Sequence, residues 1–319
     1  LEDLCISRPR SRLAWGIELP FDPDYVCYVW VDALVNYLTG LGFPDDPAWE
    51  SRWEATEHLI GKDILKTHGV FWTTILHAAG IPLFRHLHVH GYWNVDARKI
   101  SKSLGNVISP LAMKERYGFE PFRFYLLREM SYGLDAGFGE SAMVTRANAD
   151  LSNALGNLVS RTLNMTGRFA GGAVPEPDVS GPDEARVREA LARAGEEVDA
   201  AVRRVEPHRA LEALFRAVAE ANRYLDGKAP WQATKDPERE GEVRTTLFTT
   251  CQALHGIARL LAPFLPEAAA EILRRLGAPE GGVGTLPEAA ADFEALAPGT
   301  ATAKGPPLFP RLEAPETAA

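Results

Sequence analysis

Cysteine is scarce in this sequence, and long apolar runs are absent from it. Only three cysteines occur in 319 residues and none lies in a CxxC pair, which argues against a disulfide framework and against a thiolate zinc site. No stretch approaches the roughly 18 uninterrupted apolar residues of a membrane span. The first residues also lack the basic and apolar regions of a secretory signal. We therefore expect a protein of the reducing cytoplasm that does not cross a membrane.

Positive charge is also in short supply, but it is unevenly distributed. The net charge of −9 argues against non-specific binding of nucleic acid, which needs a basic surface. Between residues 61 and 102, however, the basic residues outnumber the acidic ones; they are Lys62, Lys66, Arg85, Arg98, Lys99 and Lys102, against Asp63 and Asp96. The composition is otherwise globular, with 46% hydrophobic and 24% charged residues, and the length suffices for two domains.

Short apolar runs alternate with amphipathic segments in the first part of the chain, which is the pattern of an α/β fold. We predict buried strands at 25–30, 58–61 and 85–93, with helices at 32–40 and 62–80 between them. Successive strands separated by helices pair in parallel, so their carboxyl ends should share one edge of a sheet.

Long amphipathic helices replace this pattern from about Ser141 onward. Before them, Ser109 and Pro110 predict the start of a helix that ends at Gly118. Apolar residues then recur at spacings of three and four in the segments 151–169, 211–225 and 243–264. An all-α helix bundle should therefore follow the α/β part. The tail from 279 is rich in Gly, Pro and Ala and should be irregular, although "LFPRLE" at 308–313 is apolar enough to pack.

The segment 98–106, "RKISKSLGN", follows the third predicted strand. Lysine is a compact point charge, so Lys99 and Lys102 on a glycine-flanked loop could follow a phosphate during a reaction. Gly91, at the end of the strand, would let a nucleotide approach the backbone. The alternative is a solvated basic turn. The position beyond a strand of an α/β unit, where ligands bind, favours the phosphate loop.

Three histidines, His86, His88 and His90, alternate along the same strand. Side chains along one strand are too far apart to converge on one ion. We therefore expect no metal site here, and regard these histidines as packed or solvated unless a ligand engages them.

Polar and aromatic residues also gather at the start of the 62–80 helix. Asp63 lies in its first turn, and His68, Phe71 and Trp72 lie near the same side by i, i+4 spacing. A carboxylate there can accept from an amine or a sugar hydroxyl. Trp30 at a strand end and Tyr37 on the next helix could complete a small hydrophobic pocket. An ordinary helix-start Asp with core aromatics is equally compatible with this stretch alone.

The helical part carries its own candidates. Asn157 and Arg161 are four apart on a predicted helix, and both residue types read base edges. Trp231 follows the rigid Pro230 after another helix, where an indole could stack on an unpaired base. A solvated polar face and an aromatic core plug are the alternatives.

Seven motifs occur in an order that resembles one known family. They are "DLCISRP…WGIELP", "YVWVDALVNY", "GKDILKTHGVFW", "HGYWNVDARKISKSLGN", "FRFYLLREM", "DLSNALGNLVSR" and "ANRYLDGKAPW". Together they resemble the bacterial methionyl-tRNA synthetases, which are class I aminoacyl-tRNA synthetases. The resemblance implies a partial Rossmann-type catalytic domain followed by an α-helical anticodon-binding bundle. The implied parts are the catalytic half at 1–95, the lysine loop and connecting segment at 96–140, the bundle at 141–278 and a tail at 279–319 that packs back on the protein.

The resemblance also implies ligands and roles for individual residues. It implies ATP-dependent activation of methionine and its transfer to tRNA(Met) by a monomer, with Mg2+ accompanying ATP. Lys99 and Lys102 match the catalytic lysines of the family's KMSKS loop, with Ile100 in place of Met. The implied ATP-binding residues are Lys99, Ser101, Lys102, Ser103, Asp63, His90, Gly91 and Arg8. The implied methionine-binding residues are Trp30, Tyr37, Asp63, His68, Phe71 and Trp72, and the implied anticodon-binding residues are Asn157, Arg161, Pro230 and Trp231.

One departure from the family is large. Its N-terminal half, which carries the His-x-Gly-His motif and a zinc-bearing insertion, has no counterpart in this sequence, so zinc is expected only in that half. The sequence also begins with Leu1 instead of Met. We therefore expect about half of an enzyme, without full activity of its own. Two alternatives stay open: a class I synthetase for leucine, isoleucine or valine, and a non-catalytic tRNA-binding module.

Overall fold

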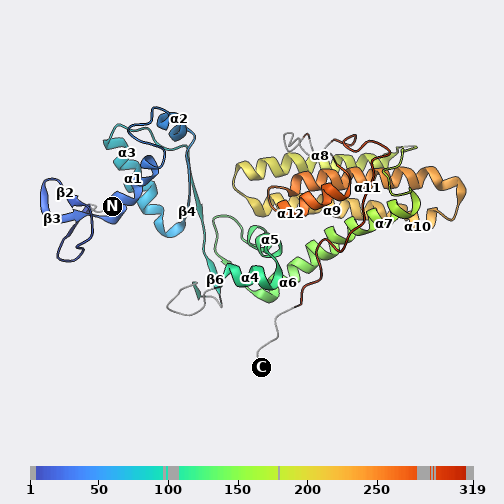
Figure 1. The fold of residues 1–319 in the computed structure, drawn as a ribbon, viewed down its shortest axis with the longest axis horizontal. Helices are drawn as coiled ribbons and strands as arrows, with labels where there is room; N and C mark the ends of the chain where they lie inside the picture. Colours follow the sequence, from blue (N-terminus) through green and yellow to red (C-terminus); the bar gives the residue numbers. More distant parts are fainter. Residues whose placement is uncertain are drawn as a thin grey trace, which may run out of the picture. The chain divides into compact units, whose positions relative to one another are not determined.

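The computed structural model describes residues 5–95, 98–99, 108–178, 180–278, 288, 290 and 292–313. The chain divides into two compact units, Leu1–Tyr92 and Trp93–Ala319. The first is α/β and the second is mostly helical (Figure 1). The predicted change from an α/β to an all-α pattern is thus confirmed. Every helix of the described part is too short or too polar to cross a lipid bilayer.

A small antiparallel sheet begins the first unit. Its strands are β1 (Ser7–Pro9), β2 (Glu18–Leu19) and β3 (Asp22–Cys27), in the order β1-β3-β2. The strand predicted at 25–30 is therefore wrong at its end, because helix α1 (Val29–Thr39) already contains Trp30. A short apolar run fits a strand and a buried helix equally well. Asp32 in the first turn of α1 favours the helix through its dipole.

Two parallel strands follow. They confirm the strand predicted at 58–61, whereas the one predicted at 85–93 is too long, because it ends at His90 and Trp93 begins a separate strand in the second unit. The two strands are β4 (Glu57–Gly61) and β5 (His86–His90), and their register places Gly61 opposite His90. The carboxyl ends of both strands therefore lie at one edge, as parallel pairing requires.

The crossover between β4 and β5 is more complex than the single helix predicted at 62–80. It consists of the 3-10 turn η1 (Lys62–Ile64), the π-helix η2 (Thr67–Trp72) and the α-helix α3 (Thr73–Ala78). It ends at Gly80, whose φ of 70° suits glycine. Helix α2 (Trp49–Glu54) completes the unit. The buried core is Leu34, Leu38, Trp53, Trp72 and Leu76.

The second unit begins with a three-stranded sheet and three helices. The sheet has the order β7-β6-β8, with β6 at Trp93–Val95, β7 at Arg98–Lys99 and β8 at Ala136–Gly137. The helices are α4 (Pro110–Tyr117), α5 (Phe119–Glu129) and α6 (Glu140–Arg146). The predicted start and end of α4 are confirmed, because the Ser109 hydroxyl accepts from the Ala112 N–H at 3.3 Å and Gly118 has a φ of 86°.

The helix bundle makes up most of the second unit. Its helices are η4 (a π-helix, Ala147–Gly156), α7 (Asn157–Phe169), α8 (Pro182–Arg203), α9 (Pro207–Lys228), α10 (Pro230–Ala233), η5 (Pro237–Arg239), α11 (Glu240–Leu261) and α12 (Pro266–Arg275). Helices α8 and α9 lie side by side, and α11 packs against both (Figure 1). Helix α11 is buried along most of its length and forms the centre of the core.

Helix α5 contacts the turn between α11 and α12 through two charged side chains. The buried Glu120 carboxylate accepts from the backbone N–H groups of Glu267 (2.7 Å) and Ala268 (3.0 Å). One turn later, the Arg123 guanidinium donates to the carbonyls of Phe264 (2.6 Å) and Pro263 (3.3 Å). These groups lie at helix ends, where backbone partners are lacking.

The C-terminal tail lies along the bundle. Phe309 is buried in the main core, and Leu308 and Leu312 pack against it. The Asn148 side-chain amide holds the Leu312 backbone from both sides, with Nδ2 donating to the carbonyl at 2.9 Å and Oδ1 accepting from the N–H at 2.8 Å. Residues 292–313 of the tail are irregular apart from isolated turns and one bridge, whereas the described residues 288 and 290 are helical.

Candidate functional site

Aromatic side chains from several elements of the first unit converge in one cluster. Ring centroids within it lie 4.3 to 6.4 Å apart. Its members are Trp30, Tyr37, Trp53, His58, His68, Trp72 and Phe84. Trp53 and Trp72 are fully buried, whereas Tyr37 is 38% exposed. The cluster is therefore buried at Trp53 and Trp72 and exposed to solvent at Tyr37.

Tyr37 and His68 join across this cluster by a hydrogen bond. The Tyr37 hydroxyl lies 3.0 Å from His68 Nε2, and His68 Nδ1 lies 3.0 Å from the Ile64 carbonyl. Because a carbonyl only accepts, Nδ1 must carry the proton, and in a neutral ring Nε2 then accepts from the tyrosine. The arrangement fixes both rings and gives His68 a single tautomer.

A second histidine, His58, lies beneath that pair and was missed on the sequence. Its Nε2 accepts a 3.2 Å hydrogen bond from the Trp72 indole N–H, and its ring lies 4.4 Å from that of Tyr37. Burial, assisted by the nearby His68, lowers the pKa of His58 to about 4. His58 is therefore a neutral acceptor at physiological pH. The one available signal was its place within the β4 strand pattern "HLIG".

Phe71 is the predicted pocket residue that the structure places elsewhere. Its half-buried ring lies 5.4 Å from the Lys66 ammonium, and among the described residues it makes no ring contact with the cluster. The prediction used α-helical i, i+4 spacing, whereas η2 is a π-helix with a wider turn. Consequently Trp30, Tyr37, His68 and Trp72 come together and Phe71 does not join them.

Two of the predicted nucleotide-site residues lie at the edge where β4 and β5 end. A Cβ atom on Gly61 would lie 2.9 Å from Asp63 Oδ1 and 3.7 Å from the His90 ring. A side chain at Gly61 would require the Asp63 carboxylate to shift, so glycine lets this carboxylate and the His90 ring lie close to the backbone. His90 Nδ1 lies 2.7 Å from the Gly91 carbonyl, which fixes the ring. Arg8, in β1, has its guanidinium 4.3 Å from the centre of the Tyr28 ring.

The lysine loop falls largely outside the described residues. Ser101, Lys102 and Ser103 lie outside them, as does the side chain of Lys99. The backbone of Lys99 belongs to β7 and pairs with Asn94 of β6. The strand that precedes the loop in the sequence therefore belongs to the second unit.

A second candidate site lies at the end of the bundle. The Arg161 guanidinium of α7 lies 5.2 Å from the centre of the Trp231 ring, which is 38% exposed. Arg161 also lies 2.5 Å from the carboxylate of Asp226 on α9. Asn157 is exposed one turn before Arg161, and the buried Pro230 begins α10. These residues form a polar surface with an accessible indole.

Asp226 is a further residue that sequence reasoning missed, although it lies within the motif "ANRYLDGKAPW".

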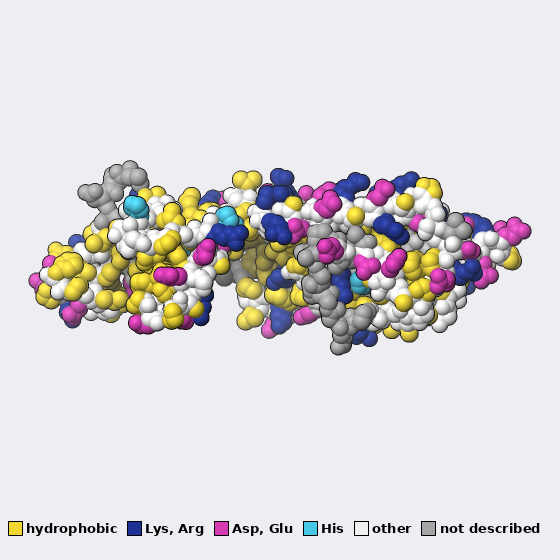
Figure 2. All heavy atoms as spheres, turned by 90° about the horizontal axis from the view of Figure 1, so that it is seen from above, with side chains coloured by type: hydrophobic (Ala, Val, Ile, Leu, Met, Phe, Trp, Pro, Cys, Tyr) yellow, Lys and Arg dark blue, Asp and Glu magenta, His cyan; other side chains and the backbone are white. Residues whose placement is uncertain are grey.

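Basic and acidic side chains are interspersed over the bundle face seen in Figure 2. Within the described ranges, no three or more His, Cys, Asp or Glu side chains are arranged to hold a metal ion. The candidate sites are thus aromatic and hydrogen-bonding surfaces.

Both parts of the chain match described protein families. Residues 1–163 match the family "tRNA synthetases class I (M)", and residues 174–319 match the "Anticodon binding domain of methionyl tRNA ligase". The two matches together include the aromatic cluster, the strand edge and both sides of the Arg161–Trp231 contact.

Individual relatives are similar over nearly the whole chain. Methionine–tRNA ligase of Mycobacterium bovis is 40% identical over 325 residues, covering 99% of this chain and 60% of that protein. The Brucella melitensis ligase is 41% identical over 322 residues, with coverage of 99% and 60%. The chain therefore spans about 60% of the length of these curated relatives.

Solved structures agree with this similarity. Mycobacterium tuberculosis methionyl-tRNA synthetase in complex with methionyl-adenylate has a TM-score of 0.89 and 38% identity, covering 98% of this chain and 61% of that one. The apo form of the same enzyme has a TM-score of 0.87 and 36% identity, with coverage of 99% and 61%.

Proposed function

The chain belongs to the methionyl-tRNA synthetase family, and we propose that it reads the methionine anticodon and supplies part of the site for methionine and ATP. Family membership argues against the alternative that the chain is a leucine, isoleucine or valine synthetase. The activity, substrates and partners of the chain itself are our proposal.

Anticodon recognition rests on one observation above all, the contact of Arg161 with Trp231. The indole is 38% exposed and lies beside a guanidinium at 5.2 Å, which leaves a flat surface on which an unpaired base can stack. Asn157, one turn away on α7, offers an amide that can donate to and accept from a base edge. We propose that these residues, with Pro230 directing Trp231, bind the splayed anticodon of tRNA(Met).

Binding of a short RNA hairpin tests this proposal. A stem-loop with the anticodon CAU should bind the 319-residue chain more tightly than one with a changed anticodon base, by about tenfold or more, because a good base contact discriminates by ~1–3 kcal/mol. Fluorescence anisotropy at fixed ionic strength measures both affinities, since phosphate contacts depend on salt. Equal affinities would contradict anticodon reading.

For methionine, we propose the aromatic cluster as the binding surface. A thioether interacts favourably with aromatic rings, and Tyr37 lies at the open side of the cluster, hydrogen-bonded to the fixed His68. Trp30 and Trp72 would supply the apolar walls. We include Phe71 only as a residue at the margin, because its ring lies against Lys66.

For ATP, we propose the strand edge and the lysine loop. Close packing of Asp63 and His90 around Gly61 provides a carboxylate for a ribose hydroxyl or the methionine amine, and a ring near the nucleotide. Gly91 would let the nucleotide approach the backbone closely, and Arg8 would bind near the phosphates. We propose that Lys102, assisted by Lys99 and flanked by Ser101 and Ser103, stabilises the phosphate charge while the methionine carboxylate attacks the α-phosphorus and pyrophosphate leaves, with Mg2+ accompanying ATP.

Methionine-dependent exchange of pyrophosphate into ATP tests the catalytic proposal. When the chain is joined to the family's N-terminal half, we expect exchange with methionine and not with leucine, isoleucine or valine, and loss of this exchange in Lys102→Ala. Normal exchange in that variant would contradict the role proposed for Lys102.

A non-catalytic tRNA-binding module is the remaining candidate. The reading frame upstream of Leu1 distinguishes it from a ligase. An in-frame continuation that encodes His-x-Gly-His supports the ligase, whereas a start codon at that place favours the module.

A further inference from the structure

A buried carboxylate, Glu184, lies at the start of α8 and binds three groups. It accepts from the Gly181 backbone N–H at 2.7 Å and from the Tyr224 hydroxyl at 2.8 Å, and the Lys228 ammonium lies 3.1 Å away. Lys228 is also 3.1 Å from the Asp183 carboxylate. Glu184 therefore links the first turn of α8 to the last turn of α9.

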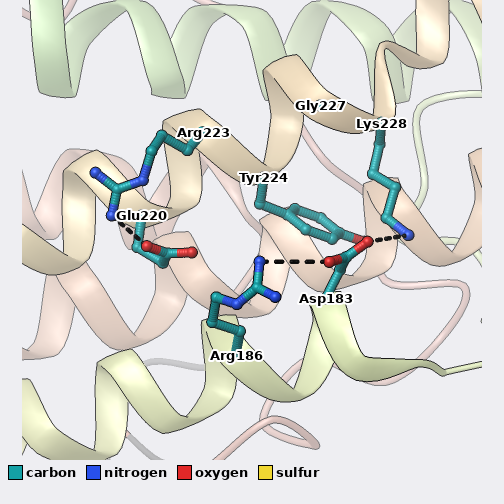
Figure 3. Close-up of a pocket in the computed structure, with 7 residues that line it drawn as sticks. All are labelled: Asp183, Arg186, Glu220, Arg223, Tyr224, Gly227 and Lys228. Carbon is teal, nitrogen blue, oxygen red and sulfur yellow. Dashed lines mark hydrogen bonds and ion pairs between the residues drawn. The ribbon is translucent and has the colours of Figure 1, made fainter.

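Asp183, Tyr224 and Lys228 border a cavity of about 240 Å3 between α8 and α9. Figure 3 shows Lys228 reaching Asp183 beside the ring of Tyr224. On the same wall, Arg223 pairs with Glu220 instead. The cavity thus has two separate sets of charged residues. In the first, Lys228 joins the end of α9 to Asp183 of α8. In the second, Arg223 and Glu220 both lie on α9.

The first set also includes Arg186, which lies 3.4 Å from Asp183, so its two carboxylates face two cations. Burial acts to raise the pKa of Glu184, but hydrogen bonds from Tyr224, Gly181 and Lys228 outweigh it and hold that pKa below its usual value. Burial likewise acts to lower the pKa of Lys228, and bonds to Glu184 and Asp183 outweigh it and raise that pKa. Both groups are therefore ionised near neutral pH, and removal of Lys228 would leave the buried Glu184 carboxylate without its cation.

Lys228 is also the last residue of α9, three positions before Trp231. The next residue, Ala229, has left-handed backbone angles of φ 41° and ψ 58°, which an L-residue adopts only when its surroundings impose them. Pro230 and Ala233 of α10 are buried after it. The corner between α9 and α10 is thus held on one side by the core and on the other by Lys228.

We propose that Glu184, Tyr224 and Lys228 are positioning residues for anticodon recognition, because they fix the corner that orients Trp231 toward Arg161. This inference rests on the proposed function of Trp231. It predicts that the network contributes to base selection through the position of Trp231 and not through contacts of its own with RNA. A network that only joins α8 to α9 would contribute to stability without affecting selectivity.

The test compares variants of the full 319-residue chain by their affinity for the CAU stem-loop. Lys228→Met keeps the side-chain length and removes the charge. We expect affinity to fall about tenfold, and selectivity over a changed anticodon to fall with it, because a misplaced indole forfeits part of its stacking energy. Lys228→Arg should restore both, since a guanidinium can still bind the two carboxylates. Arg223→Gln is the matched control, and it should bind like the unmodified chain.

The readouts separate this inference from the proposed function. If the unmodified chain does not select CAU, anticodon reading fails and this inference fails with it. If the unmodified chain selects CAU and folded Lys228→Met does so equally, only the positioning role is wrong. Should Lys228→Met not fold, Tyr224→Phe, which removes one hydroxyl from Glu184, gives the decision. Unchanged selectivity in that variant would overturn the proposal, and reduced selectivity that Lys228→Arg does not share would support it.

Discussion

Arg161 and Trp231, 70 positions apart in the sequence, meet at 5.2 Å through the guanidinium and the indole ring. The contact joins α7 to α10 at the surface of the bundle. A cation over an exposed ring contributes about 0.5–1 kcal/mol. Its larger consequence is geometric, since Arg161 is also held by Asp226 at 2.5 Å and so keeps the indole face in a defined place.

Replacing Trp231 should therefore affect RNA binding more than folding. We expect Trp231→Ala to weaken binding of the CAU stem-loop by about 1–3 kcal/mol, the range found for loss of one base-stacking aromatic. The melting temperature should change little, because the side chain is 38% exposed. Trp231→Phe, which keeps a ring, serves as the control and should lose less affinity. Undiminished binding by Trp231→Ala would remove the main support for the stacking role.

Trp72 should be a stability residue of the first unit as well as a pocket wall. It is fully buried and donates to His58 at 3.2 Å. Trp72→Phe loses volume and leaves the buried His58 acceptor without its donor, so we expect a loss of about 2 kcal/mol. Urea unfolding measures it. The exposed Trp15, in the same unit, provides a control, since Trp15→Phe should leave the urea midpoint unchanged.

Acid should destabilise the first unit through His58. The unfolded chain binds a proton at this residue near pH 6.5, whereas the folded chain binds it only at about 4. Between these values the unfolded state holds more protons, so stability rises with pH and is lost as pH falls from 6.5 toward 4. The slope for one histidine is about 1.4 kcal/mol per pH unit. Titration of the His58 ring by NMR checks this, and a pKa near 6.5 would disprove it.

Asn148 should control release of the C-terminal tail. Its amide makes two hydrogen bonds to the Leu312 backbone, and Asn148→Ala should cost about 1–2 kcal/mol of tail attachment. Trypsin cuts after Arg311, so cleavage there should become faster in the variant while the bundle stays intact. Asn153→Ala removes an exposed amide from the same helix and should leave the cleavage rate unaltered. Equal rates for both variants would show that the tail is held by its apolar residues instead.

Local signals were sufficient for much of the fold. Ser109, Pro110 and Gly118 predicted α4 because caps and breakers act over a few residues. The strands β4 and β5 were likewise predicted from their apolar runs. Trp30 was misplaced into a strand because a six-residue apolar run does not distinguish strand from buried helix. The π-helix η2 was not predicted, since it requires a local insertion into helical hydrogen bonding that side-chain periodicity does not reveal.

Several members of the aromatic cluster were predictable from the sequence, but their geometry was not. Trp30, Tyr37, His68 and Trp72 were named from the sequence, yet only the fold reveals that His58 lies beneath them. Asp226 was overlooked because its meaning depends on Arg161, which lies 65 positions earlier. Long-range partners of this kind are set by tertiary packing, and no local pattern encodes them.

The contacts of α5 with the turn between α11 and α12 have a consequence for dividing the chain. Glu120 supplies acceptors for N–H groups at the start of α12, and Arg123 supplies donors for carbonyls after α11. The free N–H groups that start α12 and the free carbonyls that follow α11 are thus both given partners by α5, a short helix that precedes the bundle in the sequence. A cut between α5 and α6 would separate these groups, so the smallest piece in which the bundle folds by itself should begin before Phe119 instead of at the first long helix.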